Sequence, residues 1–193
     1  MTPAPTEHDV DHSRPVRHGD AVAERSLTSR AVTVQQLPPH TAAYIREQGA
    51  VRGLFRDPLA EVTHGLRTDE QTTKKRLFGG TRTKVRTVEM LLTPELLVVS
   101  YRDGGDDDVD PAAQVGFHRL HQLEFSMLPA ELLDRARGAP IETPNGLLPL
   151  TSTPVGGHSR STRMVPMDSG PDAARFGDAL FTAVDRSRRG TGT

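Results

Sequence analysis

The stretch TKKRLFGGTRTKVRTVEMLLTPELLVVSYRD, from Thr73 to Asp103, predicts the fold of this chain. Its first half carries six basic residues and no acid, whereas its second half is apolar and rich in β-branched residues. Gly79-Gly80 is a tight-turn signal because glycine adopts positive φ without strain. Thr93-Pro94-Glu95 marks a second turn. The pattern therefore predicts three antiparallel strands with short connections, over residues 74–78, 83–92 and 96–101.

The segments that follow extend this β pattern and then change to a helix. Residues 114–126 are predicted to form one or two strands, and residues 146–152 and 162–167 form one strand each. A short helix is predicted over 128–137. A final helix begins near Pro171, and its apolar residues Phe176, Leu180 and Val184 recur every four positions. Six or seven short strands followed by one amphipathic helix predict a mainly β (α+β) fold. We expect a bent antiparallel sandwich or barrel capped by the C-terminal helix.

The N-terminal part of the chain has a different character. Residues 1–36 are polar, mixed in charge and without periodicity, which predicts a disordered arm. A short helical lead-in over 37–62 begins near Pro39 and ends before Pro58. The expected organisation is then one domain over 63–189 and a tail over 190–193.

Composition excludes several classes of function. The 193 residues have a formal net charge of −1, 4% aromatic residues and no cysteine. The near-zero charge argues against a general nucleic-acid binder, and the scarcity of aromatic residues argues against a platform for stacked bases. Without cysteine there is no disulfide, thiolate metal site or cysteine nucleophile. With no run of 18 apolar residues and no secretory signal, we expect a cytoplasmic protein that is not integral to a membrane, with peripheral attachment left open.

No group of residues supports catalysis, a cofactor or a metal. His118 and His121 would point to opposite faces of a strand, so they would not chelate one metal. The loop from Asp103 to Asp110 holds five acids, but Pro111 stands where a calcium loop needs glycine. We interpret it as solvated, with the further hypothesis that it covers the basic strand and competes with an anionic partner. Turn chemistry explains the arginine-containing loop around 156–163 more simply than an anion site does.

The segments LFGGTRTKVRTVEMLLTPELLVVSYRD, VGFHRLHQLEF and PDAARFGDALFTAVDRSRR resemble, in their order, the pleckstrin-homology-like superfamily, especially its bacterial members. The resemblance covers roughly Thr68 to Arg188. It implies a binding module for phosphoinositide headgroups or for proteins. In lipid-binding members, a basic residue on the first strand precedes a spacer and a basic–any–basic triplet on the second. Here Lys75 is followed by eight residues and then Lys84-Val85-Arg86.

The candidate binding site is this basic hairpin. Alternate residues of a strand share a face, so the basic side chains of the second strand project together, and glycine amides at the turn can face an anion. The predicted site comprises Lys74, Lys75, Gly79, Gly80, Arg82, Lys84 and Arg86. The predicted function is a non-catalytic interaction module, not an enzyme, that binds an acidic protein partner or anionic lipid headgroups. A solvated strand face explains the same residues. The alternative function is a structural subunit of a larger assembly, docked through its N-terminal arm and helix.

Overall fold

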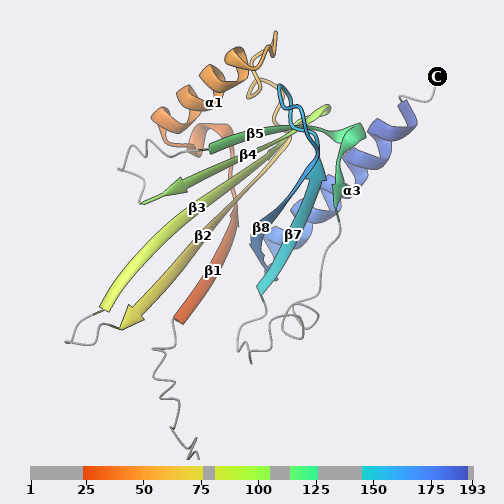
Figure 1. Ribbon diagram of the computed structural model, residues 1–193. Helices are drawn as coiled ribbons and strands as arrows, with labels where there is room; N and C mark the ends of the chain where they lie inside the picture. Colours follow the sequence, from red (N-terminus) through yellow and green to blue (C-terminus); the bar gives the residue numbers. More distant parts are fainter. Residues whose placement is uncertain (1–23, 76–80, 105–113, 126–144, 191–193) are drawn as a thin grey trace, which may run out of the picture.

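The protein is a sandwich of two antiparallel sheets. The computed structural model describes residues 24–75, 81–104, 114–125 and 145–190 (Figure 1). The larger sheet contains, in chain order, β1 (Glu24–Ala31), β2 (His64–Lys75), β3 (Thr81–Leu92), β4 (Leu96–Asp103) and β5 (Gln114–Arg119). The smaller sheet contains β6 (Glu124–Phe125), β7 (Asn145–Ser152) and β8 (Ser161–Asp168). The mainly β fold is thus confirmed. No hydrogen-bonded strand pair joins the two sheets among the described strands, so the sandwich is open rather than a closed barrel.

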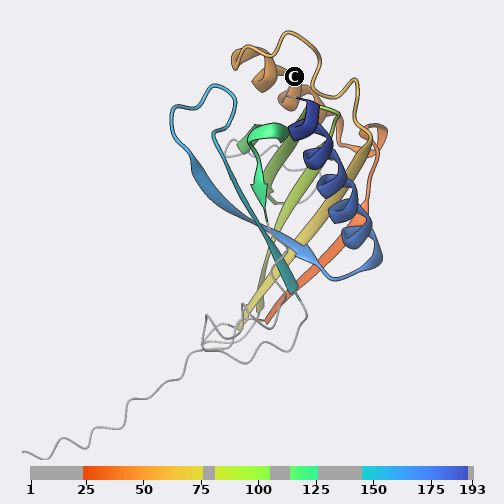
Figure 2. The ribbon, with the colours of Figure 1, turned by 90° about the vertical axis from the view of Figure 1, so that its right-hand side faces the viewer.

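Two α-helices and two short 3-10 helices complete the described structure. They are η1 (Val34–Gln36), α1 (Pro39–Val51), η2 (Leu120–Gln122) and α3 (Pro171–Gly190). α1 lies over one end of the larger sheet, on the face turned away from the smaller sheet (Figure 1). α3 crosses the side of the sandwich, where it contacts β1, β2 and η2 (Figure 2). The predicted capping of the sandwich by the C-terminal helix is confirmed.

The main core lies between the two sheets and α3. The apolar stripe of α3 enters it, with Phe176, Leu180 and Val184 all buried. Burial of one such side chain contributes about 1.5–3 kcal/mol, so the helix is held mainly by this stripe. The sheets contribute the inward residues Leu66, Val88, Met90, Leu92, Leu97, Val99, Leu148, Leu150, Val165 and Met167.

A second core lies on the outer face of the larger sheet, beneath α1. Ile45 of α1 packs there against apolar residues of three neighbouring strands: Leu91, Val98, Val115 and Phe117. The middle of β3 and of β4 is therefore covered on both faces. This explains why the apolar runs 90–92 and 97–99 are continuous rather than alternating.

The structure corrects the predicted N-terminal boundary. Residues 24–36 of the predicted disordered arm contain β1 and η1, whereas residues 1–23 of that arm lie outside the described part of the chain. β2 begins at His64, ten residues before the predicted strand start. Both strands are polar because β1 is an edge strand and the outer part of β2 lies beyond the core. Residues 76–80, 105–113 and 126–144 lie outside the described part of the chain. The glycine turn, most of the acidic loop and the predicted helix over 128–137 fall there.

Within the described residues, neither helix combines the length and apolar character needed to cross a bilayer. Pro166 lies in β8, an edge strand of the smaller sheet, where a residue without a backbone N–H is tolerated.

Candidate functional site

The inner face of the larger sheet changes from apolar to charged toward one end. Because side chains alternate along a strand, the core residue Val88 of β3 is followed in the same row by Arg86 and Lys84. On β4, Val99 is followed in the same way by Tyr101 and Asp103. The inward row of β8 makes a matching change, from Met167 and Val165 to Arg163. The polar ends of these rows form the mouth of the sandwich.

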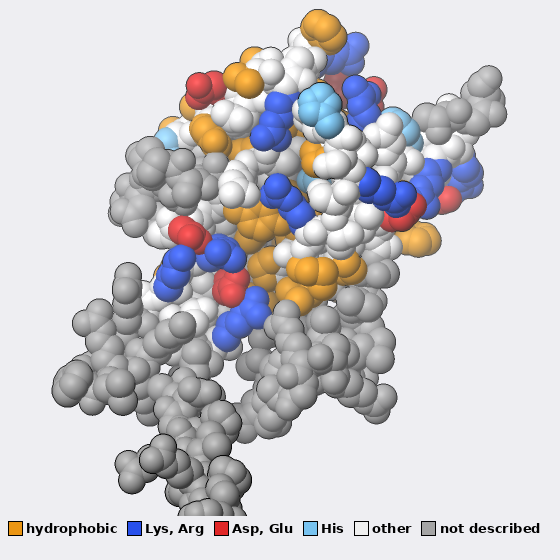
Figure 3. Space-filling model, in the orientation of Figure 1, with side chains coloured by type: hydrophobic (Ala, Val, Ile, Leu, Met, Phe, Trp, Pro, Cys, Tyr) orange, Lys and Arg blue, Asp and Glu red, His pale blue; other side chains and the backbone are white. Residues whose placement is uncertain are grey.

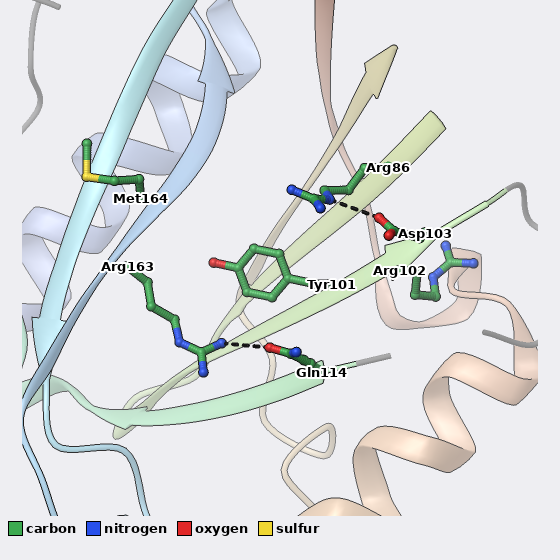
Figure 4. A pocket seen from close by; sticks show the side chains of 7 residues that line it. All are labelled: Arg86, Tyr101, Arg102, Asp103, Gln114, Arg163 and Met164. Atoms are coloured by element: carbon green, nitrogen blue, oxygen red, sulfur yellow. Dashed lines mark hydrogen bonds and ion pairs between the residues drawn. The ribbon is translucent and has the colours of Figure 1, made fainter. Parts of the chain in front are cut away.

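At this mouth lies a cleft of about 360 Å³ between β8 and the larger sheet. Figure 4 shows Tyr101 reaching from β4 toward β8, with Arg86 on one side of the ring and Arg163 on the other. On the face drawn in Figure 3, basic and acidic side chains lie beside hydrophobic ones near the gap between the sheets. The residues that border the cleft are Arg86, Tyr101, Arg102, Asp103, Gln114, Arg163 and Met164. The guanidinium group of Arg102 turns to the opposite face of the sheet, where it binds Glu89.

Lys84, Arg86 and Asp103 form an ionic group that we call the mouth cluster. The Lys84 Nζ donates to Asp103 Oδ2 at 2.8 Å, and the Arg86 Nε donates to Oδ1 at 2.9 Å. These two hydrogen bonds hold the pKa of Asp103 below its usual value. The bond to Asp103 in turn raises the pKa of Arg86. The side chains are 61%, 49% and 38% exposed, in that order, so water and salt screen the attraction.

Tyr101 and Arg163 give the cleft an aromatic floor and a further cation. The guanidinium carbon of Arg163 lies 6.0 Å from the centre of the Tyr101 ring, within the range of a cation–π contact. Arg163 Nη1 also makes a long hydrogen bond of 3.4 Å to Gln114 Oε1. Burial raises the pKa of Tyr101 above its usual value, so its hydroxyl remains protonated at neutral pH. A neutral hydroxyl donor and the cations Arg86 and Arg163 therefore line a cleft that holds one carboxylate, and Lys84 lies beside the cleft on that carboxylate.

Of the predicted hairpin site, Arg86 lines this cleft and Lys84 lies beside it in the mouth cluster. Lys84 and Arg86 share the inward face, as the alternation predicted. Lys74, Lys75 and Arg82 lie in described strands, but their side chains are outside the described part, as are Gly79 and Gly80. The register pairs Thr72 with Lys84 and Lys75 with Thr81. The convergence of Lys75 with Lys84 and Arg86 stays a prediction, because the side chain of Lys75 lies outside the described part of the structure.

Sequence reasoning missed Tyr101, Gln114 and Arg163. The predicted strand over 162–167 includes Arg163, but its charge was attributed to turn chemistry, whereas the side chain lies in the inward row of β8. Its alternation with Val165 and Met167 was the available signal. Asp103 was assigned to the acidic loop, yet the β3–β4 register sets it directly opposite Arg86. The hypothesis that the acidic loop covers the basic strand can be examined only at Asp103, because Asp103 is the one acid of that loop whose contacts are described.

His118 lies deeper in the same inward face and acts as a packing group. It is 3% exposed, and its Nδ1 lies 2.5 Å from Ser152 Oγ. Burial, and then the nearby charges of Arg163 and Arg52, lower its pKa to about 4. His118 is thus neutral at pH 7. His121 lies in η2, and no group of three or more acidic or histidine side chains that could hold a metal occurs among the described residues.

Comparison with protein-family models finds no match for this chain, and comparisons with curated proteins and with solved structures find none either. The pleckstrin-homology-like assignment therefore remains a prediction from the order of segments.

Proposed function

We propose that the protein is a non-catalytic binding module that takes an acidic segment of a partner protein in the mouth cleft. The observation that carries this proposal is the position of Asp103. Its carboxylate accepts hydrogen bonds from Lys84 and Arg86 at normal distances, one on each oxygen. The two cations are thus spaced to bind one carboxylate. An incoming Asp or Glu side chain can replace Asp103 at little cost, because exposed ion pairs contribute only about 0–1 kcal/mol.

The shape and lining of the cleft favour a protein segment over a lipid surface. The cleft is recessed between two sheets, and its lining combines cations with Tyr101 and the partly exposed Met164. An extended chain can place a carboxylate on Arg86 and apolar atoms on the ring within a few residues. A flat array of headgroups would meet the exposed rim but not the ring. Binding to anionic vesicles is the alternative, and a vesicle assay distinguishes it from binding to a protein segment.

The docking role predicted for the N-terminal arm and helix stays a prediction, since one side of α1 packs within this chain while Val51 and Phe55 are exposed. α1 buries Thr41, Ile45 and Gly49, and Ile45 packs on the outer core of this same chain. The proposal therefore rests on the mouth cleft alone.

The test is fluorescence anisotropy with a labelled peptide of mixed Glu and Tyr residues, alongside sedimentation with vesicles that contain anionic lipid. Reversing two charges in Lys84→Glu/Arg86→Glu should weaken peptide binding by about tenfold or more, because charge-assisted bonds become repulsion. The matched control is Arg56→Glu/Arg186→Glu, which reverses two exposed charges outside the cleft. It should change affinity by less than about twofold.

Three outcomes contradict the proposal. Equal losses in the cleft variant and in the control would show non-specific attraction. Binding to anionic vesicles without binding to the peptide would assign the cleft to lipid. Peptide binding that survives both Lys84→Glu/Arg86→Glu and Arg163→Glu would place the site elsewhere.

A further inference from the structure

The edge of β8 that faces away from β7 presents backbone N–H groups at alternate residues. The N–H of Asp168 donates at 3.0 Å to Ser29 Oγ of β1, so it points away from β7. Pro166, two positions earlier, has no N–H to offer β7 and stands in the same alternate set. Because the direction of the N–H alternates along a strand, those of Thr162 and Met164 also point outward.

These outward groups in the first half of β8 are open. Among the described strands, β8 pairs with β7 alone. No group in the described part of the chain accepts a hydrogen bond from the N–H of Thr162 or Met164 on this outward side. Residues 161–164 are all exposed, whereas the rest of the strand is largely buried. An open edge of this kind is a template on which another strand can pair. We call it the free edge of β8.

Parts of the other sheet edges are closed by contacts that take the place of a strand. On β1, the N–H of Ala31 donates to the Asp172 carboxylate at 2.9 Å. On β5, the C=O of Phe117 accepts from the N–H of Val155 at 2.8 Å. The end of β8 is closed by its bond to Ser29. The free edge has no such cover within the described structure.

The free edge borders the mouth cleft. Arg163 and Met164 both belong to the wall of the cleft. Figure 4 shows their side chains on opposite sides of β8, with that of Arg163 directed toward Tyr101 and that of Met164 directed away from it. A strand added here places one row of its side chains beside Arg163 and the other beside Met164, which is 42% exposed. Cross-strand neighbours of opposite charge stabilise a pair, so the inward row favours acids.

We propose that the acidic partner segment binds in the mouth cleft as an added β-strand on the free edge of β8. Its backbone pairs with Thr162 and Met164, and an acid of its inward row lies beside Arg163. The next residue along the segment packs on Met164. The inference rests on the proposed function, because it states how the same segment is held. It adds a requirement that charge alone does not make, namely acids at alternate positions.

The first experiment compares two labelled peptides of equal composition by fluorescence anisotropy. One alternates Glu and Tyr, and the other has the same residues in adjacent pairs. The alternating peptide should bind at least about fivefold more tightly, because it alone puts every acid on one face of a strand. Methylation of single backbone nitrogens in this peptide should weaken binding severalfold at every second position only, since only those N–H groups point toward β8.

The second experiment follows amide hydrogen exchange of the isotope-labelled full chain by NMR. Without peptide, the outward amides of Thr162 and Met164 should exchange rapidly. With saturating alternating peptide, their exchange should slow by at least about tenfold, because they become hydrogen-bonded. The amides of Arg163 and Val165 point toward β7, so their exchange should be slow in both states.

A matched pair of variants tests the same backbone group. Met164→Pro removes an outward N–H that β7 does not use, whereas Met164→Ala shortens the same side chain and keeps the N–H. The proline variant should bind the alternating peptide at least about fivefold more weakly than the alanine variant. If Met164→Pro does not fold, hydrogen exchange of the unmodified chain decides the question.

The added strand is overturned if the two peptides bind equally, or if saturating peptide leaves exchange at Thr162 and Met164 unchanged. Either result, with binding that still depends on Lys84 and Arg86, leaves the proposed function intact. If neither peptide binds at all, the proposed function fails, and the added strand fails with it.

Discussion

The mouth cluster and the outer-face cluster of Arg67, Asp69, Glu89 and Arg102 both pair basic side chains with carboxylates, on opposite faces of one sheet, yet they differ in burial. In the mouth cluster every side chain is more than a third exposed. In the outer-face cluster Glu89 and Arg102 are 0% and 3% exposed. An exposed ion pair exchanges partners easily because water solvates either ion once the pair opens. A buried pair is locked, since an ion left alone there has no solvent. We therefore expect exchange of partners at the mouth and rigidity at the outer face.

Residues of the same strand belong to both clusters. Arg86 and Glu89 are only three positions apart in β3, but they occupy opposite faces. The inner face near Arg86 opens into the mouth cleft, whereas the outer face near Glu89 is covered by the segment that leads into α1. Burial by neighbouring layers, rather than residue type, separates the two environments.

The largest expected effect comes from breaking the buried pair. Arg102→Met or Glu89→Leu alone should lower the free energy of unfolding by about 3–5 kcal/mol, because each leaves one ion buried without its partner. The double variant Glu89→Leu/Arg102→Met should recover most of that loss. Urea unfolding of the four proteins measures this cycle. Costs below about 1 kcal/mol for both single variants would mean that the outer-face cluster behaves like the mouth cluster.

The next effect is a pH dependence from the buried His118. Its folded-state pKa of about 4 lies below the ordinary value near 6.5, so the unfolded chain binds a proton first as pH falls. Stability should therefore be full above pH 6.5 and should decrease toward pH 4, by up to about 3 kcal/mol. His118→Gln retains a polar contact for Ser152 and should flatten this slope. Identical slopes for both proteins between pH 6.5 and 4 would contradict the assignment.

The smallest effect on stability is expected at the mouth. Asp103→Asn should change the free energy of unfolding by less than about 1 kcal/mol. The matched change Asp69→Asn should cost about 1–3 kcal/mol, since this half-buried carboxylate accepts bonds from both Arg67 and Thr87. Asp103→Asn should also raise affinity for the acidic peptide severalfold, because Lys84 and Arg86 lose their internal competitor. A fall in affinity would instead make Asp103 a residue that orients the two cations.

Much of the central fold was predictable because its signals are local. The stripe of Phe176, Leu180 and Val184 predicted α3, and the runs and turns of 83–101 predicted β3 and β4. Prediction failed at β1, whose sequence ERSLTSRA has one large apolar residue. This strand is held by pairing along β2 and by contacts such as Ser29 N to Asp168 Oδ2, which join segments 139 residues apart.

The candidate site, like the fold, was predictable from the sequence only in part. Period-two alternation alone put Lys84 and Arg86 on one face. It did not reveal that Arg163 of the other sheet would approach Tyr101, or that Asp103 would lie between the two cations.

The sequence by itself determined the local periodicity of this protein: which residues alternate along β3 and β4, and which form the buried stripe of α3. Only the tertiary structure decided which charged rows open to solvent and which are covered. The reason is that alternation belongs to the geometry of one backbone segment. Burial depends on how far each layer extends over its neighbour, and that extent is set by packing between segments distant in the chain.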